Sequence, residues 1–297
     1  MSVLVGLIVM LGMFVVVPAG LGLIDGPRPR GLLLLRRAWP LLALPGAVAL
    51  WLPRSPTAAA LAAVYALATL ALALCAPARL AALLRPPPAG GPPGGLRSAA
   101  PSEVAVLTAL VTPSVAGLAL VAERAGHELL GFDLDILALT VPHFHFAGFA
   151  AALVAGLVCR TSDGAATRFA ALSVPLGTLL VLTGYFIDDW AELAGAVVLT
   201  AGMWAVALPT WRDLRPGAAD RVTRGLLAVS AAVLVATMLL ALSWALGEAT
   251  GLPHPNLTWM AATHGLGNAL GFVLCSLLAW RRLRAATPSK ETAPWPV

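Results

Sequence analysis

The stretch LDILALTVPHFHFAGFAAALVAGLVCR, residues 134–160, decides the fold of this chain. It is long and apolar enough to cross a bilayer as a helix. It nevertheless carries His143 and His145 about ten residues from its start, where a titratable side chain is costly unless it has a partner. Intramembrane histidines are usually functional for this reason. The stretch therefore predicts both a membrane span and a site within it.

Composition places the rest of the chain in the same class. The 297 residues are 59% hydrophobic and only 11% charged, with a mean hydropathy of +0.88. A soluble core cannot bury so much apolar surface, so we predict an all-α polytopic transmembrane helix bundle. The net charge of +5 comes from arginines scattered between apolar segments. Because they form no single basic face, we expect no nucleic-acid partner.

The apolar segments predict about nine membrane spans. We expect them at residues 3–24, 38–52, 57–84, 104–122, 134–159, 169–187, 191–211, 226–246 and 257–280. This assignment puts 17 of the 19 Lys and Arg residues on one side, and only Arg54 and Arg124 on the other. By the positive-inside rule, the N-terminus is then outside and the C-terminus cytoplasmic. The first span lacks a basic start and a cleavage site, so we interpret it as a retained helix.

A Pro/Gly-rich run, RPPPAGGPPGG, divides the chain into two parts. We expect residues 1–84 to form a three-helix transmembrane scaffold that contributes no catalytic side chain. Residues 85–101 then form a cytoplasmic linker, since this composition does not support a helix. Residues 102–284 form a six-helix transmembrane domain that carries the site, and residues 285–297 a disordered cytoplasmic tail.

The last span repeats the polar theme of the fifth. His264 and Asn268 are four residues apart and therefore share one helical face. At 1.5 Å per residue, both polar pairs lie about 10 to 17 Å from the outer ends of their helices. A packing seam of small residues around Asn268 is the alternative interpretation. The matching depths favour one site in the outer half of the membrane.

Three more residues join the candidate site from the turn between the sixth and seventh spans. Tyr185, Asp188 and Glu192 lie on the same outer side, and the start of a helix favours a carboxylate. A solvated turn is the alternative for this segment. His143 and His145 point about 200° apart on a regular helix, so both face one pocket only if Pro142 distorts the turn.

Two motifs resemble a known family. The strings HFHFAGF from His143 and HGLGNALGF from His264 are similar to those of the YndJ-like family of bacterial membrane proteins, over roughly Leu134 to Cys275. Members tend to have Tyr where this chain has Phe146. The resemblance implies a multi-pass protein of the bacterial cell membrane. Some members are labelled transporters, and the family brings no settled reaction.

Two functions fit the candidate residues. In the first, the chain is a membrane-embedded enzyme that isomerises, cyclises or hydrolyses a lipophilic small molecule taken from the membrane lipid, with histidine and carboxylate as acid and base. A single divalent metal on His143, His145 or His264 would serve the same chemistry, and we expect no other cofactor. In the second, the same groups form the pathway of a proton- or metal-coupled transporter.

Overall fold

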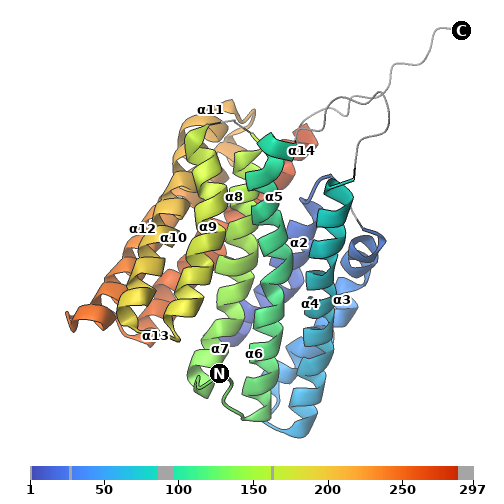
Figure 1. Ribbon diagram of the computed structural model, residues 1–297, viewed down its shortest axis with the longest axis vertical. Helices are drawn as coiled ribbons and strands as arrows, with labels where there is room; N and C mark the ends of the chain where they lie inside the picture. Colours follow the sequence, from blue (N-terminus) through green and yellow to red (C-terminus); the bar gives the residue numbers. More distant parts are fainter. Residues whose placement is uncertain (1, 27–28, 86–95, 162–163, 287–297) are drawn as a thin grey trace, which may run out of the picture.

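The computed structural model describes residues 2–26, 29–85, 96–161 and 164–286. Within these ranges the chain forms helices without any strand, and nine helices are long and apolar enough to cross a membrane. Figure 1 shows them packed side by side with their long axes roughly parallel. The predicted all-α bundle of nine spans is confirmed, and the chain is a multi-pass membrane protein.

Several spans combine α-helix with π-helical turns, which carry the label η and have hydrogen bonds from residue i to i+5. The elements in chain order are α1 (Val3–Leu11), η1 (Gly12–Val16), α2 (Val17–Gly22), α3 (Arg30–Trp51), α4 (Pro56–Leu83), α5 (Leu96–Val111), α6 (Pro113–Ala125), α7 (Leu134–His143), η2 (Phe144–Ala150), α8 (Ala151–Cys159), α9 (Ala165–Gly184), α10 (Asp189–Pro209), η3 (Thr210–Leu214), α11 (Arg215–Gly217), α12 (Arg221–Thr250), α13 (Leu257–Met260), η4 (Ala261–Gly265), η5 (Gly267–Leu274) and α14 (Cys275–Ala286).

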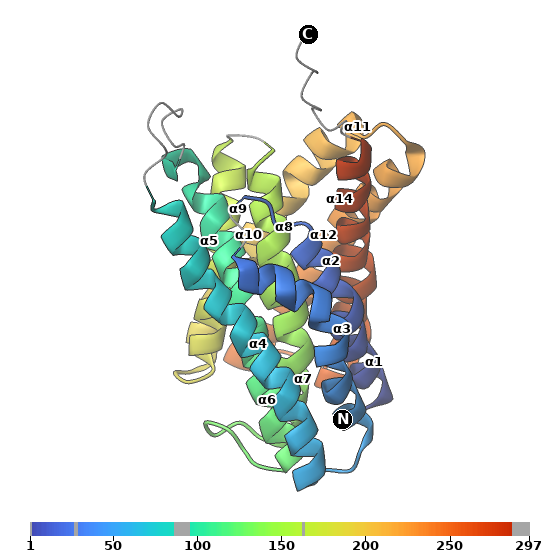
Figure 2. The same ribbon diagram turned by 90° about the vertical axis from the view of Figure 1, so that its right-hand side faces the viewer.

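Two boundaries differ from the expected ones. The second span begins at Arg30, eight residues before the predicted start at Ala38, because the helix continues through Arg36 and Arg37. Figure 2 shows the first turns of α3 lying across the neighbouring helices, and this helix contains two internal prolines, Pro40 and Pro45, of the kind that bend helices. In the predicted linker 85–101, residues 86–95 lie outside the described residues, and α5 already begins at Leu96. Residues 287–297 of the predicted tail also lie outside them.

The span that holds His143 and His145 is the central helix of the bundle. In its apolar window 83% of the residues are buried, against 28% for the last span. All nine residues of α8 are buried. One hydrophobic core extends through both predicted parts of the chain and contains Met13 and Trp39 as well as Leu153 and Phe272. The first three spans therefore pack directly on the part that carries the candidate site.

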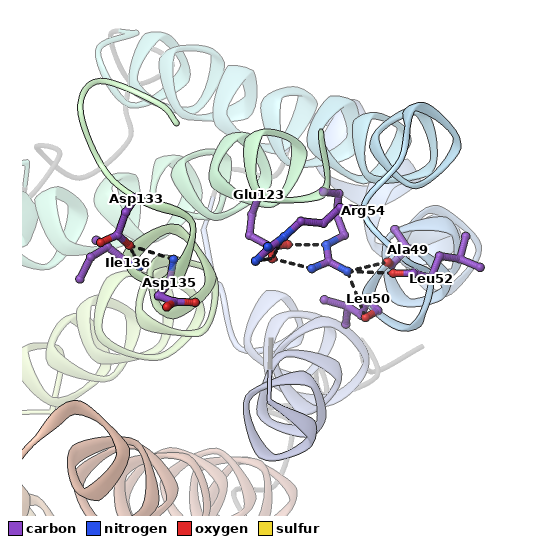
Figure 3. A network of polar contacts seen from close by, with 9 residues as sticks. Ala49, Leu50, Leu52, Arg54, Glu123, Asp133, Asp135 and Ile136 are labelled. Carbon is purple, nitrogen blue, oxygen red and sulfur yellow. Dashed lines mark hydrogen bonds and ion pairs between the residues drawn. The ribbon is translucent and has the colours of Figure 1, made fainter. Parts of the chain in front are cut away.

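The bundle has a basic end and an acidic end. The basic end is where α12 begins and α14 ends, and the acidic end is where α10 and α13 begin and α12 ends. Each end has a carboxylate held by two arginines. At the acidic end, Glu123 accepts hydrogen bonds from Arg124 and Arg54 (Figure 3). At the basic end, Glu103 accepts them from Arg79 and Arg160.

The α9 and α10 helices pack at unusually short range through glycines. A Cβ atom at Gly177 would lie 2.5 Å from the Cα atom of Leu199, and one at Gly184 would lie 2.5 Å from the Cα atom of Glu192. Such separations exclude any larger side chain, so the two backbones are in direct contact. This contact fixes the position of Glu192 at the start of α10 and of Tyr185 at the end of α9.

Candidate functional site

A cavity of about 230 Å³ lies between the spans toward the acidic end. Its walls come from the first, fifth, sixth, seventh, eighth and ninth spans, with Tyr185 at the end of the sixth. Most of the lining is apolar and includes Phe146, Met203 and Met238. Five of the seven residues predicted for the site also line it: His143, Tyr185, Glu192, His264 and Asn268. The other two, His145 and Asp188, lie outside the cavity.

His143 is the last residue of α7, where the helix changes to the π-helical turns of η2. Its ring is half-buried and faces the cavity, with the ring of Phe144 edge-on at 5.7 Å between centroids. Among the described residues, none forms a hydrogen bond or ion pair with either ring nitrogen. Both ring nitrogens of His143 are therefore available to a bound molecule. Such a molecule would offset the cost of an unpaired imidazole in an apolar cavity.

His264 is held by a closed network of hydrogen bonds. Its Nδ1 lies 2.8 Å from the backbone oxygen of Thr237, and since a carbonyl only accepts, Nδ1 carries the hydrogen. The other ring nitrogen, Nε2, therefore accepts from the Asn268 amide at 3.1 Å. The Thr237 hydroxyl donates to Oδ1 of Asn268 at 2.7 Å. This cycle fixes the tautomer of His264 and the orientation of the Asn268 amide.

His145 points to the opposite side of its helix from the cavity. It is fully buried, its Nδ1 donates to the backbone oxygen of Val141 at 2.7 Å, and its Nε2 lies 2.5 Å from the Tyr65 hydroxyl. With Nδ1 as donor, Nε2 accepts from the phenol. Both nitrogens are thus satisfied within the protein. The two histidines therefore do not share one pocket, as expected for residues two positions apart on a regular helix. His143 is the one on the cavity side.

The acidic end of the cavity contains a phenol and a carboxyl group, from Tyr185 and Glu192. Glu192 is 7% exposed and has no ion-pair partner among the described residues. Burial raises the pKa of the Tyr185 phenol above its ordinary value, and the Glu192 and Glu248 carboxylates raise it further. These three groups therefore interact electrostatically. Asp188 instead caps α10 by accepting from the backbone N–H of Ala191 at 2.7 Å, as its place before a helix start allows.

Three residues that bind the candidate histidines or line the cavity were not identified from the sequence. Thr237 holds His264 partly through its backbone carbonyl, which every residue type has, so no signal pointed to it. Tyr65 lies in the predicted scaffold, and its burial among apolar residues gave no indication of a histidine partner. Trp244 lines the cavity and contacts the ring of His254 edge-on; an aromatic residue near a span end is too common to be a signal.

The geometry also bears on the predicted metal. Within the described residues, no three His, Cys, Asp or Glu side chains are grouped so that they could hold a metal ion. Of the three candidate ligands, His145 is engaged by Tyr65 and Val141. The Nε2 atom of His264 would have to exchange its Asn268 partner for the metal. The described side chains thus fit proton transfer better than they fit metal ligation.

Comparison with known proteins agrees with the two sequence motifs. The sequence model of the YndJ-like protein family matches residues 7–272, so the similarity includes the first three spans. The "Uncharacterized membrane protein YndJ" of Bacillus subtilis (strain 168) is 25% identical over 183 residues, which are 60% of this chain and 33% of that protein. The chain thus matches about a third of the length of this relative. No solved structure shows significant similarity.

Proposed function

We propose that this chain, which belongs to the YndJ-like family, is a membrane-embedded enzyme that moves a proton within a lipophilic small molecule. One observation carries the proposal: the His143 imidazole faces an apolar cavity without a hydrogen-bonding partner among the described residues. A histidine that only packs helices together would have both nitrogens satisfied, as His145 does. An imidazole is also the side chain best suited to accept and return a proton near neutral pH.

The other polar groups have complementary roles in this proposal. The Asn268 amide has two N–H groups, and only one of them is used by His264. The second is available to a substrate oxygen, where a fixed donor stabilises negative charge as a proton leaves an adjacent carbon. The His143 imidazole takes that proton and returns it to a different carbon. The substrate is thereby isomerised with no net gain or loss of atoms.

The cavity limits which molecules fit. Its volume of about 230 Å³ lies below the roughly 300–1,000 Å³ of sites for drug-sized ligands. It therefore takes a small molecule or the reacting end of a longer lipid. Methionines on three spans, Met203, Met238 and Met260, give the walls a polarisable and adaptable surface. An apolar substrate dissolved in the bilayer suits such walls.

Solvent deuterium provides the test, because a proton-transfer enzyme exchanges substrate hydrogen with water. The full chain, reconstituted in a total lipid extract of its host in deuterated buffer, should label one or a few lipophilic species detectable by mass spectrometry. The His143→Asn variant should lose most of this labelling, by about 10²-fold or more. The His127→Asn variant is the matched control, since His127 is exposed at the same end and outside the cavity. Equal labelling by all three proteins would refute the proposal.

A transporter is the second candidate, and one observation favours it. A second cavity, of about 430 Å³, lies toward the basic end, and the first span lines both cavities: Val5 and Ile8 face one, Phe14 and Pro18 the other. Alternating access needs binding space on both sides of a gate. Uptake of a labelled lipophile into sealed vesicles, without chemical change and dependent on His143, would favour this function over the enzyme.

A further inference from the structure

The cavity at the basic end has a composition unlike that of the first. It lies between the second half of the first span, the start of α3 and the end of α14. Its walls carry three arginines, Arg36, Arg281 and Arg284, beside an apolar surface that includes Phe14, Val15 and Pro18. Charged and apolar residues thus line one space of about 430 Å³.

The three arginines differ in their partners. Arg284 donates to the Gly22 and Leu23 backbone oxygens and forms an ion pair with Asp25, with 2.5 Å between Nη2 and Oδ2. Arg36 and Arg281 have no hydrogen bond or ion pair with any described residue. Among the described residues, the charge of Arg284 is therefore balanced and those of Arg36 and Arg281 are not. Two unbalanced guanidinium groups facing one cleft attract an anion.

Arg36 and Arg284 converge on the same residue at the end of α2. Arg284 Nη1 lies 3.2 Å from the Gly22 oxygen, and a Cβ atom at Gly22 would lie 3.3 Å from Nη2 of Arg36. The absence of a side chain at Gly22 lets the guanidinium of Arg36 approach the backbone. Two guanidinium groups at close range present the planar sets of donors that bind phosphate oxygens.

We propose that this cleft binds the phosphate of an anionic phospholipid. The phosphate would bind Arg36, which lies beside Arg284, and Arg281, which lines the same cleft, with an acyl chain along Phe14 and Val15. The apolar part of the cleft is itself accessible, because Val15 is 39% exposed. A free phosphate ion would use the arginines but not this apolar surface. Basic pockets between helices at the cytoplasmic side bind lipid head groups in this way.

The test compares two variants of equal charge. In Arg36→Gln/Arg281→Gln both unbalanced arginines are removed from the cleft. In Arg37→Gln/Arg224→Gln the same number of charges is removed from exposed residues outside it. Binding is measured on the full chain in detergent, by native mass spectrometry during titration with phosphatidylglycerol or with phosphatidylcholine. We expect phosphatidylglycerol binding to weaken about thirtyfold in the first variant and less than threefold in the second.

Two further measurements on the wild-type protein distinguish lipid binding from the binding of a soluble ion. Wild-type protein should retain phosphatidylglycerol in preference to phosphatidylcholine, and inorganic phosphate should displace the lipid only at far higher concentration. Equal retention of the two lipids, or equal weakening in the two variants, would overturn the proposal. Binding of inorganic phosphate without any preference for phosphatidylglycerol would also overturn it, because the apolar part of the cleft would then be unused.

Discussion

The Glu123 carboxylate is the group whose removal should destabilise the fold most clearly, and the Glu123→Gln substitution tests it. Glu123 is fully buried, and it pairs with Arg124, whose side chain is 5% exposed, and with Arg54, whose side chain is 40% exposed. Arg124 also donates to the backbone oxygens of Leu50 and Leu52 at the end of α3. Glu123 and Arg124 thus join the end of α6 to the end of α3 and to the loop between α3 and α4 (Figure 3).

The two ion pairs should contribute very different amounts to the free energy of unfolding. Removing one partner of a buried pair costs about 3–5 kcal/mol, because the other charge is left without compensation. A pair with one exposed partner contributes about 0–1 kcal/mol. Because the substituted glutamine amide still accepts one hydrogen bond and Arg124 keeps its carbonyl partners, we expect Glu123→Gln to cost about 3 kcal/mol, at the lower end of that range. Arg54→Gln should cost less than about 1 kcal/mol.

Reversible unfolding in mixed micelles with increasing sodium dodecyl sulfate measures both free energies. The double variant, Glu123→Gln with Arg54→Gln, should be about as unstable as Glu123→Gln alone, since the exposed pair is already broken. The reasoning fails if Glu123→Gln and Arg54→Gln have equal costs. It fails also if Glu123→Gln costs less than about 1 kcal/mol, because the Arg124 pair would then contribute no more than a surface pair.

Three further results are expected. Tyr65→Phe should lower the free energy of unfolding by about 1 kcal/mol through loss of the bond to His145, while deuterium labelling stays at the wild-type level. Hydrogen bonds from Thr223, with Arg282, hold the pKa of Asp220 below its usual range, so Asp220→Asn should be the less stable protein at neutral pH. That difference should shrink as the pH falls below about 4, which unfolding at several pH values measures. With the N-terminus outside, a cysteine at Glu128 should react with an impermeant reagent on intact cells, whereas one at Arg215 should react only after permeabilisation; the reverse would refute this orientation.

The features predictable from the sequence were those that follow from the free energy of moving side chains from water into the membrane. The nine spans follow from apolar length, and the presence of His143 and His264 in the lining of one cavity follows from the cost of burying polar groups at equal depth. The same reasoning explains the outlying arginines Arg54 and Arg124. They are the two that lie against the positive-inside pattern, and both are bound to Glu123.

What the sequence left open depended on helix rotation and on the backbone. Which of His143 and His145 faces the cavity is determined where α7 passes into the π-helical η2, because a π-turn changes the angle between successive side chains. The same holds for His264, which lies in η4, and Asn268, which lies in η5. No residue pattern in these segments predicts a π-turn. The carbonyl that orients His264 is equally unreadable, since it belongs to the backbone of Thr237.

The charge at the acidic end limits which net charge the substrate of the proposed enzyme can carry. The two arginines there, Arg54 and Arg124, are already bound to Glu123, so they do not offset the carboxylates of Glu192 and Glu248 near the cavity. His254 pairs with Glu248 at 3.1 Å and balances it only when protonated. An anionic head group entering at this end would meet the Glu192 and Glu248 carboxyl groups and no unpaired arginine among the described residues. We infer that the molecule handled by His143 is neutral or cationic, and that anionic lipids are held instead at the basic end, beside Arg36 and Arg281.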